Sequence, residues 1–311
     1  MSTALVTGVA GFVGSNLAHA LLEDGYTVRG IDNFETGRDK NLESLQQDEA
    51  FTFREVDIRD SETVAELTAG VDYVFHQAAV PSVPRSVDDP VMTTDANCTG
   101  TATVLDAARN AGVDTAVVAS SSSVYGSTEQ LPKVETMEPR PESPYALSKY
   151  YTEKIALQFS ELYDIDTIAL RYFNIFGPRQ DPDGEYAAVI PKFIDLMRRG
   201  ERPVIYGDGE QSRDFTFIDN AVQANILAAE GDATGEAINV GCGGRKTINE
   251  VVDALNERLG TDIEPRYDTR RPGDVRHSHA DISKAGELLG YDPVIGFAEG
   301  LERTIEHYEG M

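Results

Sequence analysis

Short apolar runs alternate with helical patterns along the first half of the chain. Between the runs, apolar residues recur at helical spacing, most clearly over 88–111 and 144–163. This alternation predicts an α/β fold with a doubly wound parallel sheet, whose ligand lies outside the carboxyl ends of the strands. The predicted strands are 3–7, 26–31, 51–56, 71–75, 115–119 and 168–171.

After residue 171 the regular alternation breaks down into loops, prolines and isolated polar groups. We expect a hairpin-like segment over 203–219, a strand at 237–240 and a helix at 248–259. The chain then divides into a first domain, 1–171, and a smaller C-terminal α/β domain, 172–311. Part of 214–236 is expected to return to the first domain.

A glycine turn follows the first predicted strand. Gly8, Gly11 and Gly14 precede a helical pattern, and the free N–H groups of a helix start favour a pyrophosphate. A plain turn would also explain the three glycines. However, Asp32 ends the second strand 18 residues after Gly14. A carboxylate there binds ribose hydroxyls and repels a 2′-phosphate, which favours NAD over NADP.

Small or polar residues also follow the third and fourth strands. Asp57 and Ile58 stand where an adenine would lie, although Asp57 serves equally well as a helix cap near Ser61. The small residues in 77–79 allow backbone to pass close to a cofactor. His76 beside them is expected to be structural.

Tyr145 and Lys149 lie on one face of the helix that Ser143 and Pro144 predict to begin. A nearby ammonium lowers the pKa of a tyrosine, ordinarily about 10, so that it can act as an acid and base. A packed tyrosine and a solvated lysine would give the same pattern. The serine run 120–123 leaves the fifth strand at the same sheet edge, either as part of this site or as a hydroxyl-rich turn.

The chain is strongly acidic, with a net charge of −26 from 53 Asp and Glu against 27 Lys and Arg. Such a field repels nucleic acid and anionic membrane, so neither is an expected partner. We interpret the charge as adaptation to a salt-rich, halophilic cytoplasm, and stability should then rise between low and molar salt. The arginines within 270–278 stand out, either as a phosphate site or as a solvated turn.

Other features point to the cytoplasm. No apolar run approaches the ~20 residues that span a bilayer, and the N-terminus leads directly into a strand. Cys98 and Cys242 are the only cysteines and do not form a metal-ligand pattern. We therefore expect reduced thiols, a cytoplasmic protein and no metal.

Together the glycine turn, the serine run and Tyr145-x-x-x-Lys149 resemble the extended short-chain dehydrogenase/reductase family, in its nucleotide-sugar branch, over essentially the whole chain. The resemblance implies a Rossmann domain in which Tyr145 is the acid and base, Lys149 holds the nicotinamide ribose, and Ser121, or else Ser122, bonds the reacting sugar hydroxyl. It implies cofactor contacts from Gly8, Gly11, Phe12, Val13, Gly14, Asp32, Asn33, Asp57, Ile58, Gln77, Ala78, Ala79, Asn97, Tyr145 and Lys149.

The serine run distinguishes the branches of this family. The 4,6-dehydratases carry Thr-Asp-Glu and the glucuronate decarboxylases a glutamate where this chain has Ser121-Ser122-Ser123. The resemblance is therefore best to the UDP-sugar 4-epimerases, and it implies a transient 4-keto sugar with retained NAD. The implied substrate contacts are Ser121, Ser122, Ser123, Tyr145, Asn174, Ala188, Val189, Arg213, Arg271, Asp274 and Ser278.

Two of these positions bear on the sugar. Ala188 replaces an asparagine common in UDP-galactose epimerases, and the small Ser278 occupies a position that gates the sugar pocket in the family. Room for a 2-acetamido group indicates UDP-N-acetylglucosamine as well as UDP-glucose.

Alternatives remain open. A UDP-glucuronate 4-epimerase would use the same catalytic residues. A dehydratase or decarboxylase is disfavoured by the three serines. An NAD-sensing binding protein without catalysis would not need Tyr145 and Lys149. Relatives form homodimers through a four-helix contact, here implied for the helices at 88–111 and 144–163. Burial of Phe159 and its apolar neighbours within one subunit explains the same pattern.

Overall fold

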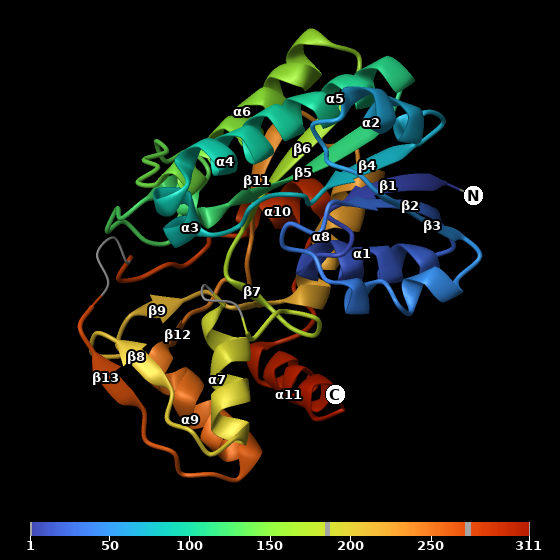
Figure 1. Ribbon diagram of the computed structural model, residues 1–311. Helices are drawn as coiled ribbons and strands as arrows, with labels where there is room; N and C mark the ends of the chain where they lie inside the picture. Colours follow the sequence, from blue (N-terminus) through green and yellow to red (C-terminus); the bar gives the residue numbers. More distant parts are fainter. Residues whose placement is uncertain (1, 184–186, 271–274, 311) are drawn as a thin grey trace.

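A seven-stranded parallel sheet forms the centre of the molecule (Figure 1). The computed structural model describes residues 2–183, 187–270 and 275–310. It confirms the predicted doubly wound parallel sheet. In spatial order the strands are β11 (Glu236–Val240), β6 (Asp166–Tyr172), β5 (Thr115–Ser121), β4 (Tyr73–His76), β1 (Thr3–Thr7), β2 (Thr27–Asp32) and β3 (Phe51–Glu55).

Helices cover both faces of this sheet (Figure 1). On one face Val64, Val104 and Ala156 pack against the strands, and on the other Leu17 and Ala224 do so. Apolar side chains on both faces explain the continuous apolar runs of the central strands. The first face carries α2 (Ser61–Thr68), α5 (Gly100–Ala111) and α6 (Pro144–Leu162); the second carries α1 (Phe12–Glu23) and α8 (Ile218–Glu230).

The helix expected over 88–111 is built from shorter pieces. α3 (Val83–Asp88) ends before α4 (Pro90–Thr94), and a π turn at Asp95–Thr99 joins α4 to α5. Pro90 starts α4 because a helix tolerates proline in its first turn. Short 3-10 turns lie at Asp39–Asn41, Leu45–Gln47 and Ser122–Tyr125.

The seventh strand, β11, joins the sheet from far along the chain. It pairs in parallel with β6, with Ala237 opposite Ala169. We had expected this strand in the C-terminal domain. It completes the sheet because Ala237, Ile238 and Val240 are buried and extend the apolar surface of β6.

A smaller C-terminal α/β region lies below the sheet in Figure 1. The expected hairpin over 203–219 is wrong, because each of its strands pairs with a more distant segment. The strand pairs are β8 (Val204–Tyr206) with β13 (Arg266–Asp268), β9 (Ser212–Arg213) with β12 (Lys246–Thr247), and β10 (Thr216–Phe217) with β7 (Ile175–Phe176). Its helices are α7 (Val189–Arg198), α9 (Ile248–Leu259) and α11 (Phe297–Glu309), while α10 (Ser283–Leu289) packs near β11.

None of the helices that the structure describes is long and apolar enough to cross a membrane.

Candidate active site

The glycine turn forms a tight cradle between β1 and α1. Gly8 has a φ of +70°, and a Cβ added there would lie 2.7 Å from the nitrogen of Ala78. A Cβ on Gly14 would lie 2.2 Å from the carbonyl oxygen of Gly8. Gly11 precedes α1 without a side-chain cap, which leaves the N–H groups of Phe12, Val13 and their neighbours to an incoming anion. The cradle therefore fits the pyrophosphate of a dinucleotide.

Asp32 is held at the end of β2 by backbone groups. Its carboxylate accepts hydrogen bonds from the nitrogen of Ala10, at 3.0 Å, and of Phe34, at 2.8 Å. Burial raises the pKa of Asp32, and these bonds oppose that rise. Each oxygen can accept a further bond, so the carboxylate fits ribose hydroxyls as predicted.

Asp57 is engaged at the end of β3 by two neighbours. Asn33 donates to it at 3.1 Å, and hydrogen bonds from Arg59 lower the pKa of Asp57 to about 2. The helix-cap alternative for Asp57 is wrong, because Asp60 accepts the capping bond of α2. Its contact with an adenine stays a prediction, as does that of the buried Ile58.

The segment after β4 lies against the glycine turn. The nitrogen of Gln77 donates to the Thr7 carbonyl, and that of Ala78 to the Thr7 hydroxyl, both at 3.2 Å. The Gln77 side chain is bound by Asn225 and Tyr172. The backbone of 77–79 thus passes close to the cradle, as expected from its small residues.

His76 is a satisfied core residue, in agreement with its expected structural role. Its ring hydrogen-bonds the hydroxyls of Thr7, at 2.8 Å, and Thr101, at 3.0 Å. Burial, with a smaller effect of Lys149, lowers the pKa of His76 to about 3. The imidazole is therefore neutral at physiological pH.

Tyr145 and Lys149 come from the first turns of α6, which begins as predicted. The Ser143 hydroxyl accepts a bond from the nitrogen of Ala146 at 3.1 Å. The Ser121 side chain, at the end of β5, lies close enough to Tyr145 to lower the pKa of its hydroxyl. Lys149 is buried, and its ammonium donates to the Ala119 carbonyl at 2.8 Å.

The pKa of Tyr145 does not follow the expectation that Lys149 lowers it, because Lys149 is not among the groups that shift this pKa. Burial raises the pKa of Tyr145, and the hydrogen bond from Ser121 opposes this rise. Burial also lowers the pKa of Lys149 to about 8. Within the chain, therefore, Ser121 is the group that favours the phenolate.

The other two serines lie in the 3-10 turn after β5. The Ser121 hydroxyl accepts a bond from the nitrogen of Ser123 at 3.2 Å. The buried Ser123 hydroxyl has no hydrogen-bond partner among the residues that the structure describes. A buried hydroxyl without a partner, two residues after Ser121, fits contact with a polar ligand. Ser122 starts the turn.

Asn97 is engaged by the protein itself. Its amide accepts from the nitrogen of Val80 at 2.8 Å and donates to the Ser148 hydroxyl at 2.9 Å. These bonds tie the π turn to α6, and its cofactor contact stays a prediction.

The expected substrate residues come from several segments. Arg213 and Ser278 are brought together at β9, since the nitrogen of Ser278 donates to the carbonyl of Ser212 at 3.0 Å. Asn174, with a φ of +34°, donates to the Asp214 carbonyl at 3.2 Å. Ala188 and Val189 form the start of α7, and Arg271 and Asp274 lie outside the described residues.

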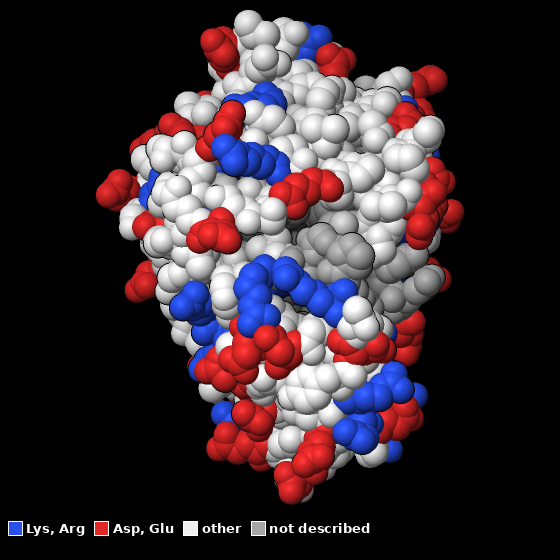
Figure 2. Space-filling model, turned by 90° about the vertical axis from the view of Figure 1, so that its left-hand side faces the viewer, with Lys and Arg blue, Asp and Glu red and all other residues white. Residues whose placement is uncertain are grey.

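Basic side chains gather on one face of this acidic molecule (Figure 2). Burial and the charges of Arg245, Arg276 and Arg213 lower the pKa of His277. A hollow of about 310 Å³ is lined by His277, Arg245 and Arg276, together with Glu210 and Glu250. Arg245 was not among the residues expected from the sequence. Its position directly after the glycine-rich turn 241–244 is the signal that could have indicated it.

The fold and the site define a dinucleotide-binding protein, with a glycine cradle at β1 and a tyrosine, a lysine and a serine between β5 and α6. The family model described as "NAD dependent epimerase/dehydratase family" matches residues 4–241. The chain therefore belongs to this NAD-dependent family, as the resemblance implied, and its cofactor is NAD.

Individual relatives cover nearly the whole chain. It is similar to a UDP-glucose 4-epimerase of Mycolicibacterium smegmatis, 39% identical over 98% of this chain and 97% of that one. It is also similar to the structure of a UDP-N-acetylglucosamine 4-epimerase of Methanobrevibacter ruminantium in complex with UDP-N-acetylmuramic acid, with a TM-score of 0.95 and 40% identity over 99% of this chain and 98% of that one. A UDP-glucuronic acid 4-epimerase of Bacillus cereus, solved with UDP-glucuronic acid and NAD, has a TM-score of 0.92 at 33% identity, with 99% of both chains covered.

Both solved structures thus share the fold of this chain over almost its full length.

Proposed function

We propose that the protein is an NAD-dependent 4-epimerase of UDP-hexoses. It would interconvert UDP-glucose with UDP-galactose, and UDP-N-acetylglucosamine with its galacto epimer, through a transient 4-keto sugar. The observation that carries this proposal is the pairing of Ser121, at the end of β5, with Tyr145 in the first turn of α6, in a serine run without a carboxylate. Elimination and decarboxylation need further acid and base groups at these positions, whereas 4-epimerisation needs one tyrosine and a hydroxyl donor.

Each residue of this group has a defined task in the proposed reaction. Tyr145 takes the proton of the sugar 4-hydroxyl and later returns it, while Ser121 holds the same oxygen. Lys149, fixed by the Ala119 carbonyl, would hold the nicotinamide ribose. NAD, when bound, would supply the hydride acceptor and donor that the change of configuration at C4 requires.

The basic cluster supports a substrate that is bound through its nucleoside diphosphate. Arg213, Arg245 and Arg276 are the cations that act on His277, and guanidinium groups match phosphate oxygens. We propose that they hold the pyrophosphate while the hexose turns over. Ser278 beside Arg213 is small, which supports acceptance of a 2-acetamido group.

A UDP-glucuronate 4-epimerase is the second candidate. The Bacillus cereus structure is one observation that favours it, and another is a UDP-glucuronate 4-epimerase of Thermodesulfobacterium geofontis that is 36% identical. Its chemistry at C4 would use the same residues. The two candidates differ only at C6 of the sugar.

Proton NMR of the purified protein in high salt tests the proposal. UDP-N-acetylglucosamine, UDP-glucose and UDP-glucuronate are supplied separately, without added NAD. We expect the galacto anomeric signal from at least one of the first two, because the hydride is returned and no net oxidant is needed. Conversion of UDP-glucuronate alone would favour the second candidate, and no conversion of any sugar, even with added NAD, would contradict both.

The variant Tyr145→Phe is the control for catalysis. It should bind the sugar nucleotide with unchanged affinity and lose turnover by about 10³-fold or more, because the general acid and base is removed. Turnover that survives this change would exclude Tyr145 from the chemistry.

A further inference from the structure

A buried ion pair lies behind the serine run. Glu153 on α6 accepts from the Nε of Arg171 at 2.8 Å and from its Nη2 at 2.6 Å. The side chains of Glu153 and Arg171 are only 1% and 3% exposed. Buried ion pairs are often no more stabilising than apolar side chains of similar volume. Stability alone therefore does not explain this pair.

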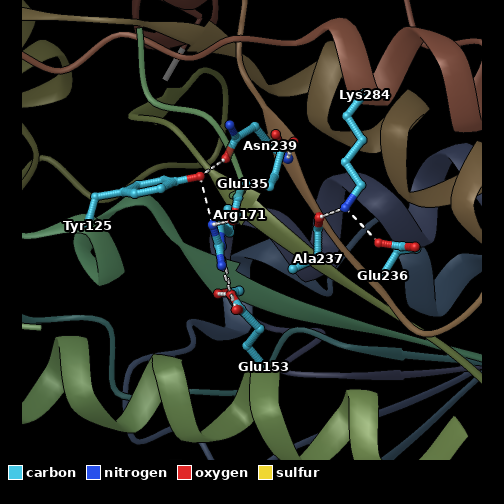
Figure 3. Close-up of polar contacts among 9 residues, drawn as sticks. Tyr125, Glu135, Glu153, Arg171, Glu236, Ala237, Asn239 and Lys284 are labelled. Carbon is cyan, nitrogen blue, oxygen red and sulfur yellow. Dashed lines mark hydrogen bonds and ion pairs between the residues drawn. The ribbon is translucent and has the colours of Figure 1, made fainter. Parts of the chain in front are cut away.

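The ion pair, shown in Figure 3 with Tyr125, holds the serine run at both ends. The Ser120 hydroxyl donates to Glu153 at 3.0 Å, directly before Ser121. The Nη1 of Arg171 donates to the Tyr125 hydroxyl at 2.7 Å, at the end of the 3-10 turn. Two residues that flank 121–124 are thus bound to the same pair.

The network extends to the edge strand of the sheet. The Tyr125 hydroxyl donates to the Oδ1 of Asn239 on β11 at 2.7 Å (Figure 3). The amide of Asn239 donates in turn to the carbonyls of Lys133, at 2.9 Å, and Asp281, at 3.1 Å. Strands β5, β6 and β11 are therefore linked at their carboxyl ends.

Glu153 lies on α6, the helix that also carries Tyr145. Glu153 follows Lys149 by four residues and Tyr145 by eight, so the three side chains project from neighbouring turns on one face of α6. A movement of the serine run relative to α6 would have to break the bonds of Glu153.

We propose that Glu153, Arg171 and Tyr125 are positioning residues, which fix the two ends of the serine run and so hold the Ser121 hydroxyl in place beside Tyr145. They act through Ser121 and touch neither sugar nor cofactor. The kinetic part of this inference rests on the proposed function. A displacement of about 1 Å in such a group can lower a rate by about 10²-fold, which sets the scale of the effect.

A double-mutant cycle with Ser121→Ala tests the inference. Tyr125→Phe removes only the hydroxyl that joins Arg171 to Asn239. In the otherwise native enzyme it should lower kcat about 10-fold and change KM less than twofold, because ground-state binding is kept. In the Ser121→Ala enzyme it should lower kcat less than twofold. Equal losses in both backgrounds would overturn the inference.

Glu153→Gln provides a second variant with the same expectation. It keeps an acceptor for Ser120 and removes the charge opposite Arg171.

Tyr26→Phe is the matched control. Tyr26 is also buried, and its hydroxyl also bonds a partner far along the chain, the carboxylate of Glu230. This contact lies at the amino end of β2, away from the serine run. Its removal should leave kcat unchanged even where it lowers the melting temperature.

Hydrogen exchange separates a failure of this inference from a failure of the proposed function. In Tyr125→Phe, amide exchange of the segment 120–126 should become about 10-fold faster, whereas Tyr26→Phe should leave it unchanged. This readout needs no turnover. Unchanged exchange in Tyr125→Phe would overturn the inference even if the wild type epimerises its substrate.

Discussion

Burial displaces the pKa values of two neighbouring residues in the site. It raises the pKa of Tyr145 and lowers that of Lys149 to about 8. The lysine thus carries its charge at neutral pH and loses it in mildly alkaline solution. The tyrosine is neutral in the chain alone, and the Ser121 bond is the local group that favours its phenolate. In the proposed reaction, proton transfer to and from Tyr145 would therefore depend on the position of the Ser121 hydroxyl.

His76 makes stability depend on pH. Its folded-state pKa of about 3 lies below the usual histidine value of 6.5. Between these two pH values the unfolded chain binds a proton at His76 and the folded chain does not. Stability is full above pH 6.5 and falls as the pH falls towards 3. Between pH 7.5 and 5.5 the contribution of His76 should fall by about 1.4 kcal/mol.

Thermal unfolding of the wild type and His76→Gln at both pH values measures this contribution. The variant should be less stable at pH 7.5, because glutamine does not reproduce both threonine bonds. The difference between the two proteins should narrow at pH 5.5. A constant difference would contradict the assignment.

Local rules predicted the principal elements. Ser143 and Pro144 start α6 where they were expected to, and the glycine turn separates β1 from α1. These features depend on residues within a few positions of one another, so they can be read from the sequence. The partners of β8 and β9 could not be predicted, because short strands carry too little pattern to specify a distant partner.

Substitution of Gly14 tests the role of the glycine cradle between β1 and α1. In Gly14→Ala the new Cβ would lie 2.2 Å from the Gly8 carbonyl oxygen, so the turn must open. We expect at least 10-fold weaker NAD binding, measured by calorimetry, together with a lower melting temperature. Gly244→Ala is the control, since a Cβ there meets no atom within 4 Å. Equal NAD affinity in the two variants would contradict the role of the cradle.

Exposed apolar side chains on α3, α4 and α6 indicate a surface for contact between two subunits. Val87 and Val91 are 63% and 78% exposed, and Leu147 and Tyr151 on α6 are 58% and 40% exposed. A group of this kind is typical of an interaction surface. Phe159 is partly buried against the core of the subunit, which agrees with the alternative given for it from the sequence. We propose a homodimer through these helices.

Analytical ultracentrifugation tests the dimer. The double variant Val87→Asp, Val91→Asp should sediment as a monomer, because two carboxylates would be buried in the contact. Val294→Asp is the control, since Val294 is 66% exposed elsewhere and should leave the dimer intact. A monomeric wild type would contradict the proposal.

The sequence by itself determined the order and type of most elements, the acidic surface, the glycine cradle and the Tyr145–Lys149 pair. All of these depend on composition or on spacing over a few residues. The tertiary structure decided that β11 completes the sheet, that Arg245 joins Arg213 and Arg276 around His277, and that Glu153 meets Arg171. Such contacts join residues far apart in the chain, and they form only when complementary surfaces are buried together. The same burial sets the pKa values of the site, which no local pattern contains.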